Sequence, residues 1–319
     1  MIPIDIVNEI KKYCEEETAL LYFLSTTSYY FEYRLHILWM FKHQYTKVTE
    51  KIQNLPYYNN FGNIRLDRLS IGNLPKNARS VQYTEVLNVN HFPNQNLKFL
   101  KKVLIQVDRC DANRLNHLFS YPSIQSIEIT CPVNLEYIKF PPMLKTLILF
   151  DTYYNLCTPL PKTLEKLYFI NYNQPLYQLP PHIKKLSLGT KFNRKISKED
   201  LPPSLLYLHL GNAYNQTLPP EILPTGIIEL IFGDHYNRNI NPGVIPSTVK
   251  KLELGYHYTR KIKQGTLPEG LEILTLRCKY NRRIPIEVIP LSLKKLRVPF
   301  GKVLMYRHLR NQWFDILGY

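Results

Sequence analysis

The sequence predicts two kinds of structure in one chain. We expect a short all-α module in residues 1–45 and, after it, a solenoid of short parallel β-strands with coils of 22 residues. A proline-containing segment recurs at equal intervals, apolar and polar residues alternate after each of these prolines, and the first forty-five residues show helical spacing instead. Because a 22-residue coil cannot bury its apolar side chains alone, successive coils must stack on one another.

The repeat has the form [LI]-P-x-x-[LIV]-x-x-L-x-[LFV]. Its prolines are separated by one interval of 19 residues and then by five of 22. Weaker copies begin at Phe140 and Tyr121. Five equal intervals indicate a repeat architecture. The prolines are Pro161, Pro180, Pro202, Pro224, Pro246, Pro268 and Pro290.

One unit, residues 201–218, shows how a coil should fold. Leu208 and Leu210 alternate with Tyr207 and His209, which is the period-two pattern of a short strand with one buried face. A glycine follows the strand and predicts a turn with positive φ. This glycine column holds Gly189, Gly211, Gly233 and Gly255.

An aromatic residue followed by asparagine comes next in most coils. We expect each amide to turn inward and to bond backbone groups of its own turn and of the next coil, because no strand ladder reaches those groups. Stacked one per coil, these residues form an asparagine ladder with a structural rather than a catalytic role. Thr259 departs from the pattern. The ladder residues are Asn193, Asn215, Asn237 and Asn281.

The L-x-x-L-x-L core is close to the leucine-rich-repeat pattern, and the aromatic-Asn, Ile/Leu and Pro columns at a period of 22 resemble the FNIP (IP22) repeat. The resemblance implies a leucine-rich-repeat-like solenoid over residues 140–298, with degraded copies in 70–139. We therefore divide the chain into an N-terminal module (1–45), a linker or degenerate repeats (46–120), the solenoid (121–298) and a C-terminal cap (299–319). A helix is expected in that cap, at Tyr306–Gln312 with Trp313, Phe314 and Leu317.

Residues 1–45 show apolar residues at helical spacing, with Pro3 suited to a first helical turn. Their order resembles an F-box, although Ile2 stands where the family usually has Leu. F-box followed by FNIP repeats is typical of giant DNA viruses of amoebae and of social amoebae. The resemblance implies docking on the adaptor Skp1 within a cullin-RING ubiquitin ligase. The alternative is a helical cap that shields the first coil. The expected adaptor contacts are Pro3, Ile6, Val7, Ile10, Leu20, Leu21 and Trp39.

Strand residues that point away from the core are the candidate target-binding residues. They mix aromatic, apolar and oppositely charged side chains, which suits a protein partner. They lack the regular basic and aromatic pattern of a single-strand nucleic-acid groove. The candidates are Lys185, Tyr207, His209, Glu229, Ile231, Lys251, Glu253, Ile273, Lys295 and Arg297.

A formal charge of +16, from 41 Lys and Arg against 25 Asp and Glu, first suggests binding to nucleic acid or to an anionic membrane. Part of this charge falls in one column after the asparagines, interrupted by Gln216. Three interpretations stay open: a solvated edge, a track for nucleic acid or another acidic ligand, and a contact for an acidic protein surface. This basic edge consists of Arg194, Arg238, Arg260 and Arg282.

We find no catalytic or metal-binding motif in the sequence. It has no H-E-x-x-H, G-x-S-x-G or phosphate-loop pattern. Its five cysteines form no C-x-x-C pair, so we expect neither disulfides nor zinc. We see no signal peptide and no apolar run that could span a membrane. We therefore expect a non-catalytic subunit without cofactors, in an intracellular reducing compartment. It would be a ligase subunit or a decoy, with a Skp1-like adaptor, a cullin complex and an unknown target protein as partners.

Overall fold

The computed structural model divides the chain into two compact units, Met1–Cys131 and Pro132–Tyr319. The F-box-like module expected in residues 1–45 lies outside the described residues, so it stays a prediction. The structure describes residues 46–47, 63–66, 74–84, 97–107, 112–132, 134–150, 160–176, 178–277, 279–309 and 314–318.

In the first unit, successive strands pair in parallel with their neighbours in the chain. Ile64, Val81, Val103 and Ile127 share one register position and are fully buried. Helix α5 (Ala112–Phe119) follows β4 and buries Leu115, Leu118 and Phe119. The strands are β1 (Thr46–Lys47), β2 (Asn63–Leu66), β3 (Ser80–Tyr83), β4 (Lys102–Ile105) and β5 (Ser126–Ile129).

The expectation that the cysteines form no disulfide is wrong for Cys131. Cys131 is disulfide-bonded, to a partner outside the described residues. The cysteine spacing gave no sign of this bond, because the two residues of a disulfide meet through the fold rather than through proximity in sequence.

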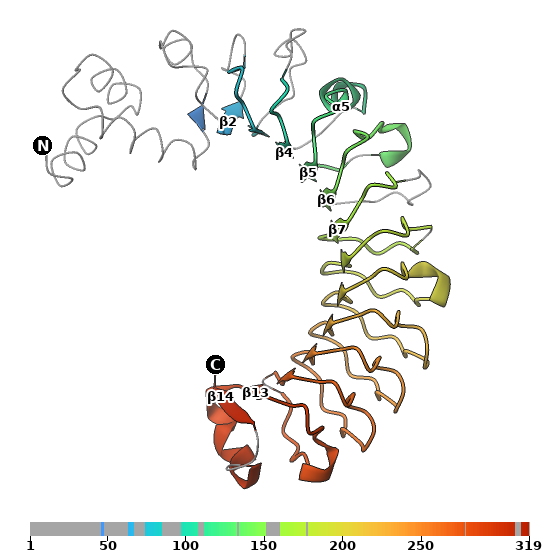
Figure 1. Cartoon of the computed structure of the whole chain (residues 1–319), viewed down its shortest axis with the longest axis vertical. Helices are drawn as coiled ribbons and strands as arrows, with labels where there is room; N and C mark the ends of the chain where they lie inside the picture. The colour runs from blue at the N-terminus through green and yellow to red at the C-terminus, as the bar shows by residue number, and fades with distance from the viewer. Residues whose placement is uncertain are drawn as a thin grey trace, which may run out of the picture. The chain divides into compact units, whose positions relative to one another are not determined.

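The second unit is a stack of coils in which each coil contributes one short strand. In Figure 1 the strands lie along the inner side of these coils, and the returning segments with the 3-10 helices lie along the outer side. The strands are β6 (Thr146–Leu149), β7 (Lys166–Phe169), β8 (Lys185–Ser187), β9 (Tyr207–His209), β10 (Glu229–Ile231), β11 (Lys251–Glu253), β12 (Ile273–Thr275) and β13 (Lys295–Val298). The 3-10 helices within the stack are η4 (Leu135–Tyr137), η5 (Lys198–Asp200) and η6 (Ile286–Val288).

The strands pair in the register that the 22-residue period predicts. Leu208 lies beside Leu230, and Leu230 lies beside Leu252. All three leucines are almost fully buried, and a second buried column follows two residues later. Alternation therefore places one apolar column at the strand centre and a second two residues later, both inside the solenoid, as a period of two requires.

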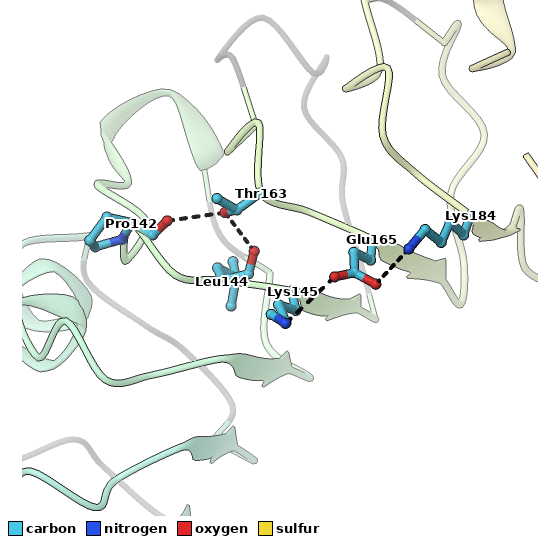
Figure 2. A network of polar contacts seen from close by, with 6 residues as sticks. All are labelled: Pro142, Leu144, Lys145, Thr163, Glu165 and Lys184. Carbon is cyan, nitrogen blue, oxygen red and sulfur yellow. Dashed lines mark hydrogen bonds and ion pairs between the residues drawn. The ribbon is translucent and has the colours of Figure 1, made fainter. Parts of the chain in front are cut away.

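Each repeat proline begins a tight turn before its strand. The carbonyl of Pro202 accepts a hydrogen bond from the Leu205 N–H at 3.2 Å, and the other six prolines do the same three residues on. A proline here loses nothing by lacking an N–H, because only its carbonyl is used. Hydroxyls reinforce several turns: Thr163 Oγ1 donates to the carbonyls of Pro142 and Leu144, 3.1 and 2.8 Å away in the preceding coil (Figure 2).

The glycine column is explained by close packing more than by backbone conformation. Gly189 and Gly211 have the expected positive φ, at 77° and 91°, whereas Gly233 and Gly255 do not. A Cβ on Gly233 would lie 1.6 Å from the carbonyl oxygen of Gly211. Consecutive coils touch backbone to backbone at this column, so a side chain cannot fit.

A buried aromatic column runs through the coils beside the strands. The ring centroids of successive members lie 6.1–6.3 Å apart and the rings are nearly parallel, with interplanar angles of 2–12°. Every ring is buried. Dispersion between stacked rings adds to the apolar burial that joins the coils. The column holds Tyr172, Phe192, Tyr214, Tyr236, Tyr258 and Tyr280.

The C-terminal segment differs from the helical cap expected there. The 3-10 helix η7 covers Phe300–Leu309, and β14 (Asp315–Gly318) adds a further parallel strand beside β13. Phe314 is buried at the start of this strand, and Leu317 lies in it. The last coil is therefore closed by a strand, which the spacing of apolar residues in such a short segment did not distinguish from a helix.

Candidate protein-binding face

The outward side chains of the strands form two regular columns. The ten predicted target-binding residues all lie in these columns and are exposed or half-buried, while the leucines between them are buried. The first strand column is Lys166, Lys185, Tyr207, Glu229, Lys251, Ile273 and Lys295. The second strand column is Tyr168, Ser187, His209, Ile231, Glu253, Thr275 and Arg297.

A third outward column precedes the strands, and strand alternation alone did not predict it. The N–H groups of Leu206 and Tyr207 both donate to the carbonyl of Lys184, at 2.9 and 3.0 Å. The same pair of bonds recurs in every coil from β7 to β13. Leu205 and Leu208 are fully buried, whereas Leu206 and Tyr207 between them are exposed and half-buried, so two consecutive side chains lie outside the core. This leading column is Lys145, Glu165, Lys184, Leu206, Ile228, Lys250, Glu272 and Lys294.

We call these three columns together the strand face. A hollow of about 130 Å³ opens on it over β10–β13, with Leu230 and Leu252 at its base. Charged and apolar side chains both reach this hollow. Its other lining residues are Glu229, Ile231, Lys251, Glu253, Ile273, Thr275 and Arg297.

Ion pairs link neighbouring coils across the strand face. Lys251 Nζ lies 3.5 Å from Glu229 Oε2. Arg277, beside the second strand column, donates through Nε at 2.8 Å and through an Nη to Glu253. These pairs are partly exposed, so each contributes little to stability. They nevertheless give both carboxylates of the strand columns, Glu229 and Glu253, a cationic partner.

Burial changes the titration of two residues on the strand face. Desolvation lowers the pKa of His209, and nearby Glu253 opposes this shift only in part. Its Nδ1 lies 3.2 Å from Ser187 Oγ. Burial likewise raises the pKa of Tyr207, whose ring lies 5.9 Å from Lys185 Nζ. Both residues are therefore neutral near pH 7, and they supply aromatic surface between charged neighbours.

Three of the four predicted ladder asparagines bond forward into the next coil, whereas the fourth, Asn281, makes no side-chain hydrogen bond within the described residues. Asn193 Oδ1 accepts from the Asn215 N–H at 2.9 Å, and Asn215 Oδ1 accepts from the Asn237 N–H at 3.0 Å. Asn237 Oδ1 in turn accepts hydrogen bonds from both the N–H and the Oγ1 hydroxyl of Thr259. These amides lie exposed or half-buried at the coil edge rather than turned inward as expected. They satisfy backbone donors that the short strands leave over.

The sequence missed the first member of this ladder. Asn173 Oδ1 accepts from the Asn193 N–H at 3.1 Å. Asn173 follows Tyr172, as the other ladder residues follow their aromatic neighbours. A coil shorter than 22 residues separates it from Asn193, so a search at fixed period passed over it. The aromatic-Asn pair itself was the signal that could have found it.

The basic edge takes part in the same stacking. Arg238 Nε donates to the Asn215 carbonyl at 2.9 Å, and Arg260 Nε to the Asn237 carbonyl at 3.0 Å. Where the column has Gln216, its amide donates to the Asn193 carbonyl at 3.1 Å. Arg194 and Arg282 make the equivalent bonds. The column therefore needs a donor for a carbonyl of the preceding coil, and a charge is not required for that role.

Three further predictions concern the adaptor contacts, metal binding and membrane spans. All seven expected adaptor contacts lie in residues 1–45, outside the described ranges. In the described part of the chain, no three His, Cys, Asp or Glu side chains gather as a metal site. Nor does any helix among those residues have the length and apolar character needed to cross a membrane.

Fold and face together define a leucine-rich-repeat-like solenoid suited to protein binding. Residues 172–213, 214–257 and 258–300 each match the family model FNIP Repeat, which confirms FNIP repeats in this part of the chain. Each match begins at a tyrosine of the aromatic column and spans about two coils. No curated protein matches the chain.

Two solved structures are similar in fold. CroV588, described as a novel circular LRR protein, aligns with 80% of this chain and 42% of its own at 24% identity and a TM-score of 0.58. A TLR13–ssRNA13 complex aligns with 76% of this chain and 44% of its own at 18% identity and a TM-score of 0.49. The chain thus spans less than half of either solved chain. The first of these likenesses supports the parallel-strand solenoid fold.

Proposed function

We propose that the chain is a non-catalytic substrate-recognition subunit of a Skp1–cullin–F-box ubiquitin ligase. Residues 1–45 would dock a Skp1-like adaptor, and the strand face would bind a target protein. The mechanism is proximity, because tethering raises the concentration of the target near the ubiquitin-charged enzyme. An origin in a giant virus of amoebae or a social amoeba belongs to the same proposal.

The observation that carries the target-binding half is the composition of the strand face. The second strand column has a different residue in every coil, and the other two columns combine recurring lysines with glutamate, tyrosine, leucine and isoleucine, although the coils beneath are uniform. Aromatic, apolar and paired charged side chains lie side by side there, as in protein interfaces. The adaptor-binding half depends on the F-box resemblance of residues 1–45.

Pull-down with purified Skp1 and the full chain tests the adaptor-binding half. We expect wild type and the conservative variant Ile6→Val to bind, and Ile6→Asp and a chain lacking residues 1–45 to fail. If wild type does not bind Skp1, the ligase proposal is lost. Ubiquitination of a bound target in a reconstituted ligase then separates a ligase subunit from a decoy, since a decoy binds both without transfer.

Nucleic acid binding along the basic edge is the second candidate. Its favourable observation is that each Nε bond to a carbonyl holds the guanidinium groups in a row, about 5 Å per coil. Binding to single-stranded RNA should then fall steeply with salt. The triple variant Arg238→Gln, Arg260→Gln, Arg282→Gln should reduce that slope while keeping the carbonyl bonds, as Gln216 does. A slope that this variant leaves unchanged removes this candidate.

A further inference from the structure

The leading column places its two apolar residues side by side. Leu206 and Ile228 are 40% and 41% exposed, and the Ile228 N–H donates to the Leu206 carbonyl at 2.8 Å. Tyr207 lies next to Leu206 in the first strand column, and Ile231 lies in the second, on the strand that follows Ile228. The middle of the strand face thus carries a small exposed apolar group on β9 and β10.

A lysine–glutamate–lysine triad flanks this apolar pair on each side. On one side, Glu165 pairs with Lys145 at 3.6 Å and with Lys184 at 3.3 Å (Figure 2). On the other, Glu272 pairs with two lysines, at 3.3 and 2.7 Å. Hydrogen bonds from these lysines hold the pKa of each carboxylate below its usual range. One carboxylate serves two ammonium groups, so each triad retains one positive charge.

The remaining columns reinforce that positive balance. From β6 to β13 the strand face holds nine Lys and Arg side chains and four Glu side chains. All four carboxylates are engaged: two in the triads, and Glu229 and Glu253 by Lys251 and Arg277. Lys185 and Lys295 make no ion pair within the described residues. The apolar centre therefore lies on a face that carries a net positive charge, with one excess cation in the triad on each side.

We infer that the strand face binds an extended segment of a partner protein with apolar side chains at its centre and Asp or Glu on both sides. This deepens the proposed function and rests on it for the statement that the strand face meets a target. The apolar centre would be desolvated by the partner, where contacts contribute most. Acidic residues of the partner would meet the flanking lysines and set orientation and association rate.

The spacing of the column sets the length of the segment. Lys184 and Lys250, which border the apolar pair, are three coil steps apart, or about 14 Å at ~4.8 Å per step. An extended peptide rises about 3.3 Å per residue. Its acidic residues should therefore be about four or five positions apart, with the apolar residues between them.

Selection from a displayed library of random peptides on the full wild-type chain tests this proposal. We expect enrichment of peptides with one or two apolar residues between acidic ones. A synthetic peptide of the most enriched sequence, measured by fluorescence polarisation, should lose at least tenfold in affinity on the variant Leu206→Gln, Ile228→Gln. The control Leu291→Gln should bind like wild type, because Leu291 is 78% exposed but lies in a turn outside the strand face.

A second variant keeps the test informative if the first folds poorly. With Lys184→Glu and Lys250→Glu, selection should enrich basic rather than acidic flanks. The proposal is overturned if wild type enriches no acidic-flanked peptides, if the Gln variant binds them equally, or if single-stranded RNA displaces them at equal concentration. If the chain binds such peptides but not Skp1, only the ligase proposal is overturned. If it binds Skp1 but not such peptides, only this inference is overturned.

Discussion

The coil edge and the strand face of the second unit belong to the same coils but follow opposite rules. At the edge, Asn193, Asn215 and Asn237 occupy equivalent positions and each bonds the next coil. On the strand face, Tyr207, Glu229 and other unlike residues occupy one column. Backbone stacking underlies both surfaces, so the coils themselves do not require the variety of the strand face.

The difference separates residues that hold the solenoid together from residues that are free to recognise a partner. The basic edge shows this best, since Gln216 replaces arginine and still bonds the carbonyl of the preceding coil. The common property of this column is a side-chain hydrogen bond to the preceding coil, and a positive charge is not common to all its members. The predictions below concern the interior and the edge, and the closing measurement compares the edge with the strand face.

The largest effect is expected at the glycine column. In Gly233→Ala the new Cβ would lie 1.6 Å from the Gly211 carbonyl oxygen, so the backbones of two coils must separate. We expect a loss of about 4 kcal/mol or more in unfolding free energy, measured by urea denaturation. The control Gly301→Ala has nothing within 4 Å of its Cβ and should unfold like wild type. A stable, native-like Gly233→Ala would mean that the coils are not packed this closely.

Alkaline pH should destabilise the aromatic column. Burial raises the pKa of Tyr280 to about 12 and those of Tyr214, Tyr236 and Tyr258 still higher. The unfolded chain ionises its tyrosines near pH 10, so their contribution is complete below about pH 10 and is lost as the pH rises above it. Each tyrosine contributes about 1.4 kcal/mol for every pH unit between its unfolded and folded pKa values, so we expect the free energy of unfolding to fall by about 3 kcal/mol or more by pH 12. Constant stability over this window would contradict a buried column.

At the edge, Asn237→Ala removes the acceptor for the N–H and Oγ1 of Thr259. We expect the unfolding free energy to fall by about 1.5 kcal/mol, since a half-buried backbone donor is left unpaired. Asn281→Ala is the matched control. Asn281 is exposed and makes no side-chain hydrogen bond within the described residues, so its change should be below about 0.5 kcal/mol. Equal losses in the two variants would contradict a forward-bonding ladder.

The smallest effect is expected from a phenol that makes no bond. Tyr236 Oη is buried without a hydrogen-bond partner, so Tyr236→Phe should be neutral or slightly stabilising. Tyr172→Phe instead loses a 2.6 Å bond to the Pro175 carbonyl and should cost about 1 kcal/mol. Phe192, natural in the same column, shows that the ring alone is accepted. A large loss in Tyr236→Phe would reveal a partner for its hydroxyl.

Much of this architecture could be predicted from sequence because the repeat encodes it locally. Proline positions fixed the period, and Leu208 with Leu210 identified the buried face of a strand. The leading column escaped prediction because alternation places Leu206 inward with Leu208, whereas Leu205 takes the buried position and Leu206 is left exposed. The close approach at Gly233 depends on the neighbouring coil, which no local pattern reports.

Urea unfolding of the Leu206→Gln, Ile228→Gln variant, beside the variant Asn215→Ala, Asn237→Ala, tests the separation between edge and strand face most directly. The strand-face variant should stay within about 1 kcal/mol of wild type, because partly exposed side chains of similar size are exchanged. The edge variant should lose about 2–3 kcal/mol. If the strand-face variant unfolds as easily as the edge variant, these apolar residues serve the fold and the account of a free recognition face is contradicted.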